Sequence, residues 1–223
     1  IPAGREPEGM ALSKDGSRLY VASANDDTLL TVDTKNRKVL SALNLRPAED
    51  PGYGQIPTNV TLSPDGKTAF ACLGGGNSLA VVSLSDSPLQ TRILGYLPTA
   101  WYPMAAAVNG DKIVVACAKG IGSRALNADG VHWSNGVVGA MQFIPLSALA
   151  ALPHQTRVVA QDNHWNLQEL PARKHIAAVP MPARVGEPSV FKHVVYIIKE
   201  NHSYDLDLGD MAEGNGDKKL CLY

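Results

Sequence analysis

Short apolar runs alternate with polar turns along residues 7–145, and this pattern repeats. Pro7, Pro57 and Pro103 occupy the same position in three successive units, separated by 50 and then by 46 residues. In each unit an apolar run follows the proline, a glycine-containing turn comes next, and a second apolar run begins after the turn. Glycine tolerates the positive φ that tight turns between paired strands require. The pattern therefore predicts a β-hairpin in each unit, with second strands at residues 19–23, 69–72 and 113–117.

Two further strands are predicted in each of the first two units. They lie at residues 28–33, 38–43, 78–83 and 90–94. Four short strands in a repeat of this length are typical of a β-propeller blade. Because a blade buries its faces only against neighbouring blades, a closed ring needs about four to eight of them. The chain supplies about three, so we expect a mainly β fold, with an incomplete propeller over residues 1–150 and a sequence that is a fragment.

A different pattern occupies the last part of the chain. Residues 194–198 are all apolar and rich in β-branched side chains. Such a run predicts a strand buried on both faces, as in a parallel sheet covered by helices. Glu200 and Asn201 follow at its carboxyl end, where ligands gather in sheets of this kind. A carboxylate beside an amide carbonyl supplies the oxygen ligands that hard divalent cations prefer.

Several of these segments resemble one known family. Residues 20–23, Tyr-Val-Ala-Ser, resemble the second strand of the YVTN family of bacterial propellers. Residues 100–103, 116–123 and 139–145 are similar to the last blade of those YVTN-type proteins that continue into a phosphoesterase domain of the phospholipase C and acid phosphatase group. Residues 184–217 resemble the junction and the start of that domain.

The resemblance implies a second domain and an activity. Residues 151–190 would connect the two parts, and residues 191–223 would begin an α/β domain of the alkaline phosphatase-like superfamily with its first strand. The implied reaction of the full-length protein is metal-dependent hydrolysis of phosphate esters. Its substrate would be a small phosphate ester or a phospholipid, and the propeller would bind or position partners. Export to the periplasm or out of the cell is implied as well.

The resemblance also assigns roles to individual residues. Glu200 and Asn201 would ligate a divalent metal cation, whose identity the sequence leaves open. The polar side chains around this pair are those of His202, Tyr204 and Asp205. The nucleophile and the remaining ligands would lie beyond Tyr223, so residues 1–223 alone are expected to be inactive. The chain departs from the family at His202 and Leu206, where Arg and Gln are common.

Other interpretations of this region stay open. In one, Glu200 and Asn201 are simply a polar strand end that faces solvent. In another, His202, Ser203 and Asp205 act as a serine hydrolase, which is disfavoured because a triad converges from separate elements whereas near neighbours on one turn point apart. The alternative function is a non-catalytic propeller that binds a protein or cell-envelope partner and carries an inactive tail, since propellers host many unrelated roles.

Cysteine placement and charge complete the sequence-based picture. Cys72 and Cys117 are predicted at one position of successive blades, where Ser23 stands in the first, and a disulfide between them stays open. Cys221 has no evident partner. The net charge is −1 and basic residues do not cluster, which argues against nucleic-acid binding. No run of about eighteen apolar residues occurs, so no membrane span is predicted.

Overall fold

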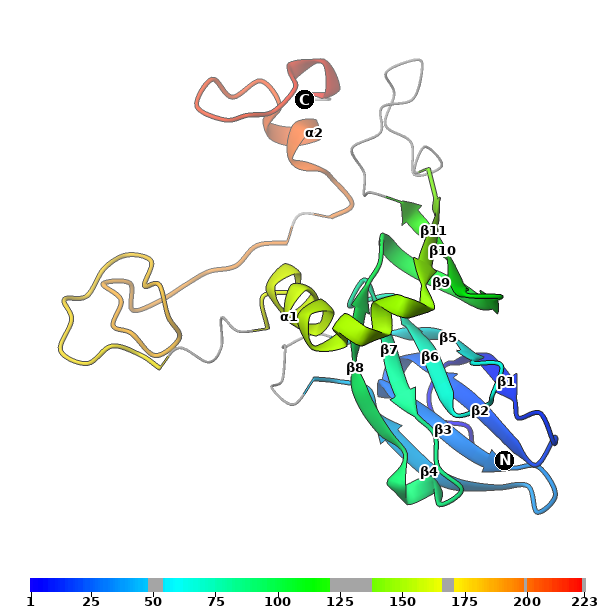
Figure 1. Ribbon diagram of the computed structural model, residues 1–223. Coiled ribbons are helices and arrows are strands. Elements are labelled where there is room, and N and C mark those ends of the chain that lie inside the picture. Colours follow the sequence, from blue (N-terminus) through cyan, green and yellow to red (C-terminus); the bar gives the residue numbers. More distant parts are fainter. Residues whose placement is uncertain (48–53, 121–137, 166–170, 199, 222–223) are drawn as a thin grey trace. The chain divides into compact units, whose positions relative to one another are not determined.

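The computed structural model describes residues 1–47, 54–120, 138–165, 171–198 and 200–221. Two compact units divide the chain, Ile1–Pro171 and Ala172–Tyr223. The first unit is built from three antiparallel sheets and one α-helix (Figure 1). Among the described residues, no helix has the length and apolar character needed to cross a lipid bilayer.

Each sheet of the first unit is a meander of neighbouring strands. The first sheet has the order β1 (Pro7–Leu12), β2 (Arg18–Ser23), β3 (Thr28–Asp33) and β4 (Lys38–Asn44). The second has the order β5 (Pro57–Leu62), β6 (Thr68–Leu73), β7 (Ser78–Ser83) and β8 (Arg92–Pro98). The third has the order β11 (Ala140–Pro145), β10 (Lys112–Gly120) and β9 (Trp101–Asn109). The prediction of a partial, propeller-like β fold is therefore confirmed.

The predicted hairpin turns are stabilised by the same side-chain contacts in the first two repeats. Ser13 donates through Oγ to Asp15 Oδ1 at 2.7 Å, and Gly16 adopts a left-handed φ of 71°. In the next repeat Ser63 donates to Asp65 Oδ1 at 2.6 Å, and Gly66 has a φ of 70°. Glycine is required at both positions because a side chain would strain this backbone conformation. The Ser-x-Asp-Gly sequence thus fixes the turn between the first two strands of the first and second sheets.

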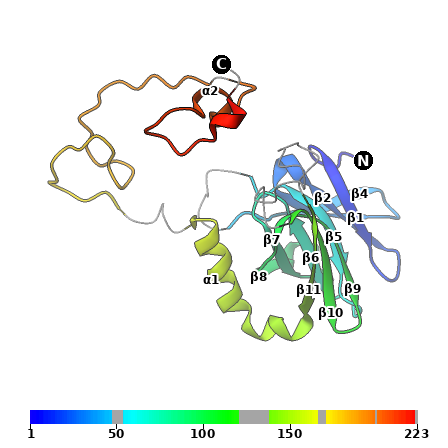
Figure 2. The same cartoon turned by 90° about the horizontal axis from the view of Figure 1, so that it is seen from above.

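The second sheet packs against a neighbouring sheet on each face. Ala69, Ala71 and Leu73 of β6 join an apolar cluster with Tyr20 and Leu29 of the first sheet. The alternate residues of β6 join a second cluster with side chains of the third sheet, among them Phe70, Cys72, Ile113, Val115 and Cys117. Because side chains alternate across a strand, one strand supplies both interfaces. The cores of the first unit therefore lie between its sheets (Figure 2).

The first sheet is also fastened to the second by a polar contact, which we call the inter-sheet latch. Asp27 lies in the loop between β2 and β3, and its Oδ1 accepts hydrogen bonds from the backbone N–H of Gln55 at 2.7 Å and of Ile56 at 2.9 Å. Arg46 donates to the other oxygen at 2.7 Å. One repeat later, Asn77 Oδ1 accepts from the N–H of Tyr102 at 2.8 Å. The loop of each sheet thus holds the first strand of the next.

The latch depends on left-handed backbone at both of its ends. Asp27 and Asn77 have φ values of 52° and 46°. Ile56 and Tyr102, which directly precede Pro57 and Pro103, have φ values of 51° and 58°. A proline disfavours the right-handed helical region for the residue before it. In both latches the residue that donates the N–H therefore stands directly before the repeated proline and has a positive φ.

A helix follows the third sheet and packs on the second. α1 (Leu152–Asp162) contacts β8, where the Thr156 hydroxyl accepts a hydrogen bond from the N–H of Tyr96 at 2.9 Å. A Cβ on Gly95 would lie 2.5 Å from Thr156 Oγ1, so the close approach requires glycine. A six-residue 3₁₀ segment, η4 (Leu146–Ala151), leads into the helix. Residues 151–190 were predicted to be a connection, whereas 152–162 form this docked helix and the first unit extends to Pro171.

The short 3₁₀ segments and the second unit complete the fold. Loops of the first unit contain η1 (Ala24–Asp26) and η2 (Pro88–Gln90). The second unit contains α2 (Tyr204–Leu208) and η6 (Lys218–Leu220). In this unit the exposed Arg173 pairs with the buried Glu187, with Arg173 Nε at 2.7 Å from Glu187 Oε1 and Arg173 Nη2 at 3.0 Å from the other carboxylate oxygen. This bidentate pair links the two ends of the segment from residue 173 to residue 187.

The predicted strand over residues 194–198 is wrong for the described structure. These residues carry no strand assignment, and their side chains are exposed, as shown by Val195 at 84% and Ile197 at 81%. A strand forms only where its N–H and C=O groups pair with a neighbour. The described part of the second unit contains no other strand that could pair with it. The apolar run is therefore extended chain, and it does not begin a sheet here.

The predicted equivalence of the two buried cysteines is also wrong. Strand pairing aligns Pro57 with Leu73 and Pro103 with Cys117. Cys117 therefore matches Leu73, and also Ser23, which pairs with Pro7. Cys72 pairs with Asn59 and stands one position earlier. A shift of one residue moves a side chain to the other face of a sheet, so the two cysteines occupy opposite faces of their respective sheets.

Candidate functional site

The two predicted metal ligands lie in the second unit, directly before α2. Glu200 and Asn201 are both exposed. Neither side chain makes a hydrogen bond to another described residue. The carboxylate of Glu200 and the amide oxygen of Asn201 are therefore accessible to solvent and to a ligand.

The neighbouring side chains are engaged with other partners. His202 Nδ1 lies 3.2 Å from both carboxylate oxygens of Asp207. Asp205 Oδ1 accepts a hydrogen bond from the N–H of Asp217 at 2.7 Å. Asp205 thus ties the start of α2 to the loop that follows it, and it does not contact the glutamate–asparagine pair.

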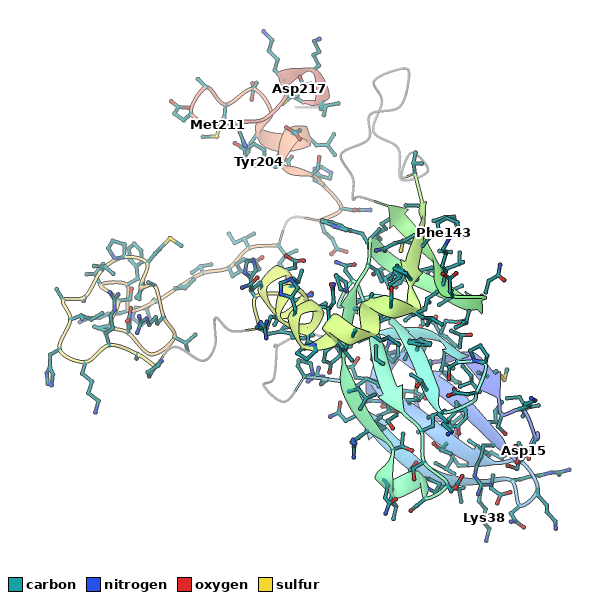
Figure 3. All side chains as sticks on the ribbon, in the orientation of Figure 1. Asp15, Lys38, Phe143, Tyr204, Met211 and Asp217 are labelled. Atoms are coloured by element: carbon teal, nitrogen blue, oxygen red, sulfur yellow. The ribbon has the colours of Figure 1, made fainter. Side chains whose placement is uncertain are left out.

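Tyr204 has a packing role in the same loop. A Cβ on Gly216 would lie 3.0 Å from Tyr204 Cε1, so the backbone of the loop runs close to the aromatic ring. Tyr204 and Asp217 are labelled together in Figure 3, where the helix and the returning loop are adjacent. The Tyr204 ring therefore packs against this loop.

A serine-hydrolase arrangement is not formed by the described residues. His202 is oriented by Asp207, and Asp205 is oriented by Asp217. Ser203 precedes α2, and its side chain makes no capping hydrogen bond. His202 and Asp205 thus face different partners, as expected for near neighbours on a turn.

A complete metal site is not present in the described part of the chain, where no three His, Cys, Asp or Glu side chains are grouped to hold an ion. Glu200 and Asn201 have the right chemistry for a hard cation, because both offer oxygen. Two protein ligands fall short of the six or so oxygen donors that such cations take. The pair therefore fits part of a divalent-cation site.

A cavity that the sequence did not indicate lies between the first two sheets. It measures about 460 Å³ and is lined by the turns at residues 13–18 and 65–67, by Tyr20 and by residues 84–86. Hydrogen bonds from Ser13 and Ser17 hold the pKa of Asp15 at about 2. A hydrogen bond from Ser63 likewise lowers the pKa of Asp65. These carboxylates are already used within their own turns.

Sequence reasoning missed this cavity because it forms only when two repeats pack together. Asp15, which is labelled in Figure 3, belongs to the first repeat, whereas residues 65–67 and 84–86 belong to the second. Burial raises the pKa of Tyr20 in the cavity wall, so its hydroxyl stays neutral at ordinary pH. The recurrence of the Ser-x-Asp-Gly turn is the one signal that could have pointed to a polar surface at this end of the sheets.

Comparisons with known proteins concern the fold. No family model matches the chain, and no curated protein matches it. Kuenenia stuttgartiensis hydrazine synthase is 21% identical with a TM-score of 0.49, over 64% of this chain and 34% of that one. A candidate 6-phosphogluconolactonase from Bacteroides uniformis is 16% identical with a TM-score of 0.44, over 63% and 40%. A similar candidate from Bacteroides fragilis is 17% identical with a TM-score of 0.43, over 63% and 39%.

The class of the protein follows from its own sheets. The chain spans 34% to 40% of the length of these three structures, and none of the likenesses bears on its activity. Three successive antiparallel meanders packed face to face give the first unit a propeller-like, mainly β fold.

Proposed function

We propose that the full-length protein hydrolyses phosphate esters with the help of a divalent cation, and that the propeller-like sheets bind or position its partners. The observation that carries this proposal is the exposed pair Glu200 and Asn201, whose side chains are not engaged by other described residues. The resemblance of residues 184–217 to the start of a phosphoesterase domain supports it.

The two residues would make different contributions to a cation site. Glu200 supplies a negative charge, whereas Asn201 supplies a neutral carbonyl oxygen. When bound, a divalent cation polarises a phosphoryl oxygen and lowers the pKa of a coordinated hydroxyl. The remaining ligands would come from other parts of the full-length protein and from water, so loss of either residue weakens cation binding without removing it entirely.

The proposal is tested with the full encoded protein and p-nitrophenyl phosphate. We expect turnover that a chelator abolishes and that an added divalent cation restores. The variants Glu200→Gln and Asn201→Ala should lower kcat/KM by at least about tenfold and raise the cation concentration needed for half activity, as for other perturbed metal ligands. Glu213→Gln is the matched control, because Glu213 is an exposed carboxylate of the same unit. Full activity in Glu200→Gln would contradict the proposal.

A second function, ligand binding without catalysis, is favoured by the cavity between the first two sheets. Its wall combines cationic, anionic and hydroxyl groups, which suits a small polar ligand. If no cation supports turnover, but a polar compound raises the melting temperature and Lys67→Ala removes that increase, ligand binding replaces hydrolysis as the better account of the protein.

A further inference from the structure

Two buried thiols face the same interface between neighbouring sheets. Cys72 lies on β6 of the second sheet and Cys117 on β10 of the third. Both belong to one apolar cluster, with exposed fractions of 0% and 2%. Both are free thiols in this structure. Cys72 faces the third sheet and Cys117 faces the second, because the two cysteines stand one position apart in the strand register.

The hydroxyl of Thr58 links β6 to β9, the strand that pairs with β10. Thr58 Oγ1 donates to the carbonyl of Pro103 at 2.7 Å and lies 3.4 Å from the carbonyl of Cys72. Pro103 is the cross-strand partner of Cys117. One hydroxyl thus sits between the backbone of the first cysteine and the immediate neighbour of the second. This contact is at the same end of β6 and β10 as the thiols.

The electrostatics of the pair agree with this placement. Burial, together with the charge that Cys117 carries when ionised, raises the pKa of Cys72 to about 12. Burial also raises the pKa of Cys117, while contacts to Thr99 and Ala100 oppose that increase. Neither thiol therefore ionises readily in the folded protein. Exchange with an external disulfide has to occur while the two sheets are apart.

We propose that Cys72 and Cys117 form a disulfide between the second and third sheets when the protein folds in the presence of a small-molecule disulfide. The thiolate of one cysteine attacks a sulfur of that oxidant, which releases one thiol and leaves a mixed disulfide. The second thiolate attacks the protein sulfur of the mixed disulfide, so a Cys72–Cys117 bond forms and the second thiol leaves. Two protons and two electrons pass from the cysteines to the oxidant, which becomes two thiols.

The disulfide requires the two cysteines to lie closer together than residues of packed sheets usually do. A disulfide needs Cα atoms within about 7 Å, whereas sheets packed face to face lie about 10 Å apart on average. The ends of β6 and β10 beside Thr58 must therefore be drawn together. The loop closed by the bond spans the sequence from Cys72 to Cys117 and contains the contact between the two sheets. Oxidation would lock that contact.

The experiment is to refold the whole chain in oxidised or in reduced glutathione and to count thiols after denaturation. The chain has three cysteines, so the reduced sample should titrate three thiols and the oxidised sample one. Digestion without reduction should release a peptide pair that contains Cys72 and Cys117. Cys221→Ser should leave this pair unchanged, whereas Cys72→Ala and Cys117→Ala should each abolish it. Reduction should lower the melting temperature by on the order of 10 °C.

Every alternative result overturns the proposal. Three titratable thiols after oxidative refolding would mean that the sheets hold the sulfurs too far apart. A linkage through Cys221, or between two molecules, would mean that the buried pair is not the favoured partner set. A correct peptide pair in wild-type protein is decisive even if the alanine variants fold poorly, because the mapping needs no variant.

Discussion

Replacing Asp27 with alanine tests the inter-sheet latch. Asp27 is 6% exposed, and its carboxylate accepts two backbone N–H groups and the Arg46 guanidinium. Alanine leaves the buried N–H of Gln55 and the half-buried N–H of Ile56 without these acceptors. A buried donor left unpaired costs about 1–3 kcal/mol. Arg46 is partly exposed, so water replaces its lost hydrogen bond, and we assign this loss little of the destabilisation.

The expected loss in the free energy of unfolding is therefore about 3 kcal/mol, a large part of the roughly 5–15 kcal/mol that stabilises a typical domain. Asp27→Asn keeps one acceptor oxygen and tolerates the left-handed backbone, so it should cost only about 1 kcal/mol. Asn77→Ala, which removes a single N–H bond at the equivalent latch, should fall between these values. Glu8→Ala, at an exposed carboxylate of β1, is the control.

The assay is urea unfolding followed by far-ultraviolet circular dichroism. The described strands all lie in the first unit, so the sheet signal reports on that unit. Surface substitutions usually change the free energy of unfolding by no more than about 0.5 kcal/mol. If the free energies of unfolding of Asp27→Ala and Glu8→Ala differ by less than this, the latch contributes nothing measurable and the reasoning fails.

Three further predictions concern single contacts. Gly95→Ala should destabilise the docking of α1 by about 1–3 kcal/mol, because the added Cβ meets Thr156 Oγ1; Thr156→Ala in the same chain should recover part of the loss in urea unfolding, and no recovery would refute the contact. Thr58→Val should cost about 1 kcal/mol through the lost hydrogen bond to Pro103, and an unchanged midpoint would contradict this. Arg173 holds the pKa of Glu187 at about 2, below its ordinary value of 4.5, so this carboxylate stabilises the second unit fully above pH 4.5 and loses its effect as the pH falls toward 2. Proteolysis of residues 172–221 should accelerate over that range in wild-type protein and stay level in Glu187→Gln; parallel curves would rule out the pair as the cause.

Local sequence signals predicted the sheets well because each hairpin is specified by its own turn. The Asp-Gly steps placed β1, β2, β5 and β6, and the apolar runs gave β3 and β7 their observed bounds. α1 was missed, although Pro153 in its first turn and the spacing of Leu152, Thr156 and Val159 are signals for a helix with one docked face. Polar residues between these positions hid the pattern.

The errors arose where the outcome depends on partners outside the segment. A run such as 194–198 becomes a strand only beside another strand, and its composition says nothing about that neighbour. The cysteines were misaligned by one residue because only strand pairing shows which residue lies opposite the repeated proline, and this residue is Leu73 in the second sheet and Cys117 in the third. The pairing of His202 with Asp207 and of Asp205 with Asp217 likewise depends on how the chain folds back after α2.

In both latches the acceptor belongs to one sheet and the N–H donor to the sheet that follows it along the chain. Asp27 belongs to the first sheet, yet the groups that it satisfies belong to the second, and Asn77 repeats this relation toward the third. In stacked repeats, stability is shared between each repeat and its interface with the next one. Damage to one sheet is therefore transmitted unequally: loss of the first sheet removes acceptors from the second, whereas loss of the third leaves Asn77 without a donor but the Asp27 latch intact. Fraying from the two ends of the stack should accordingly differ in cooperativity.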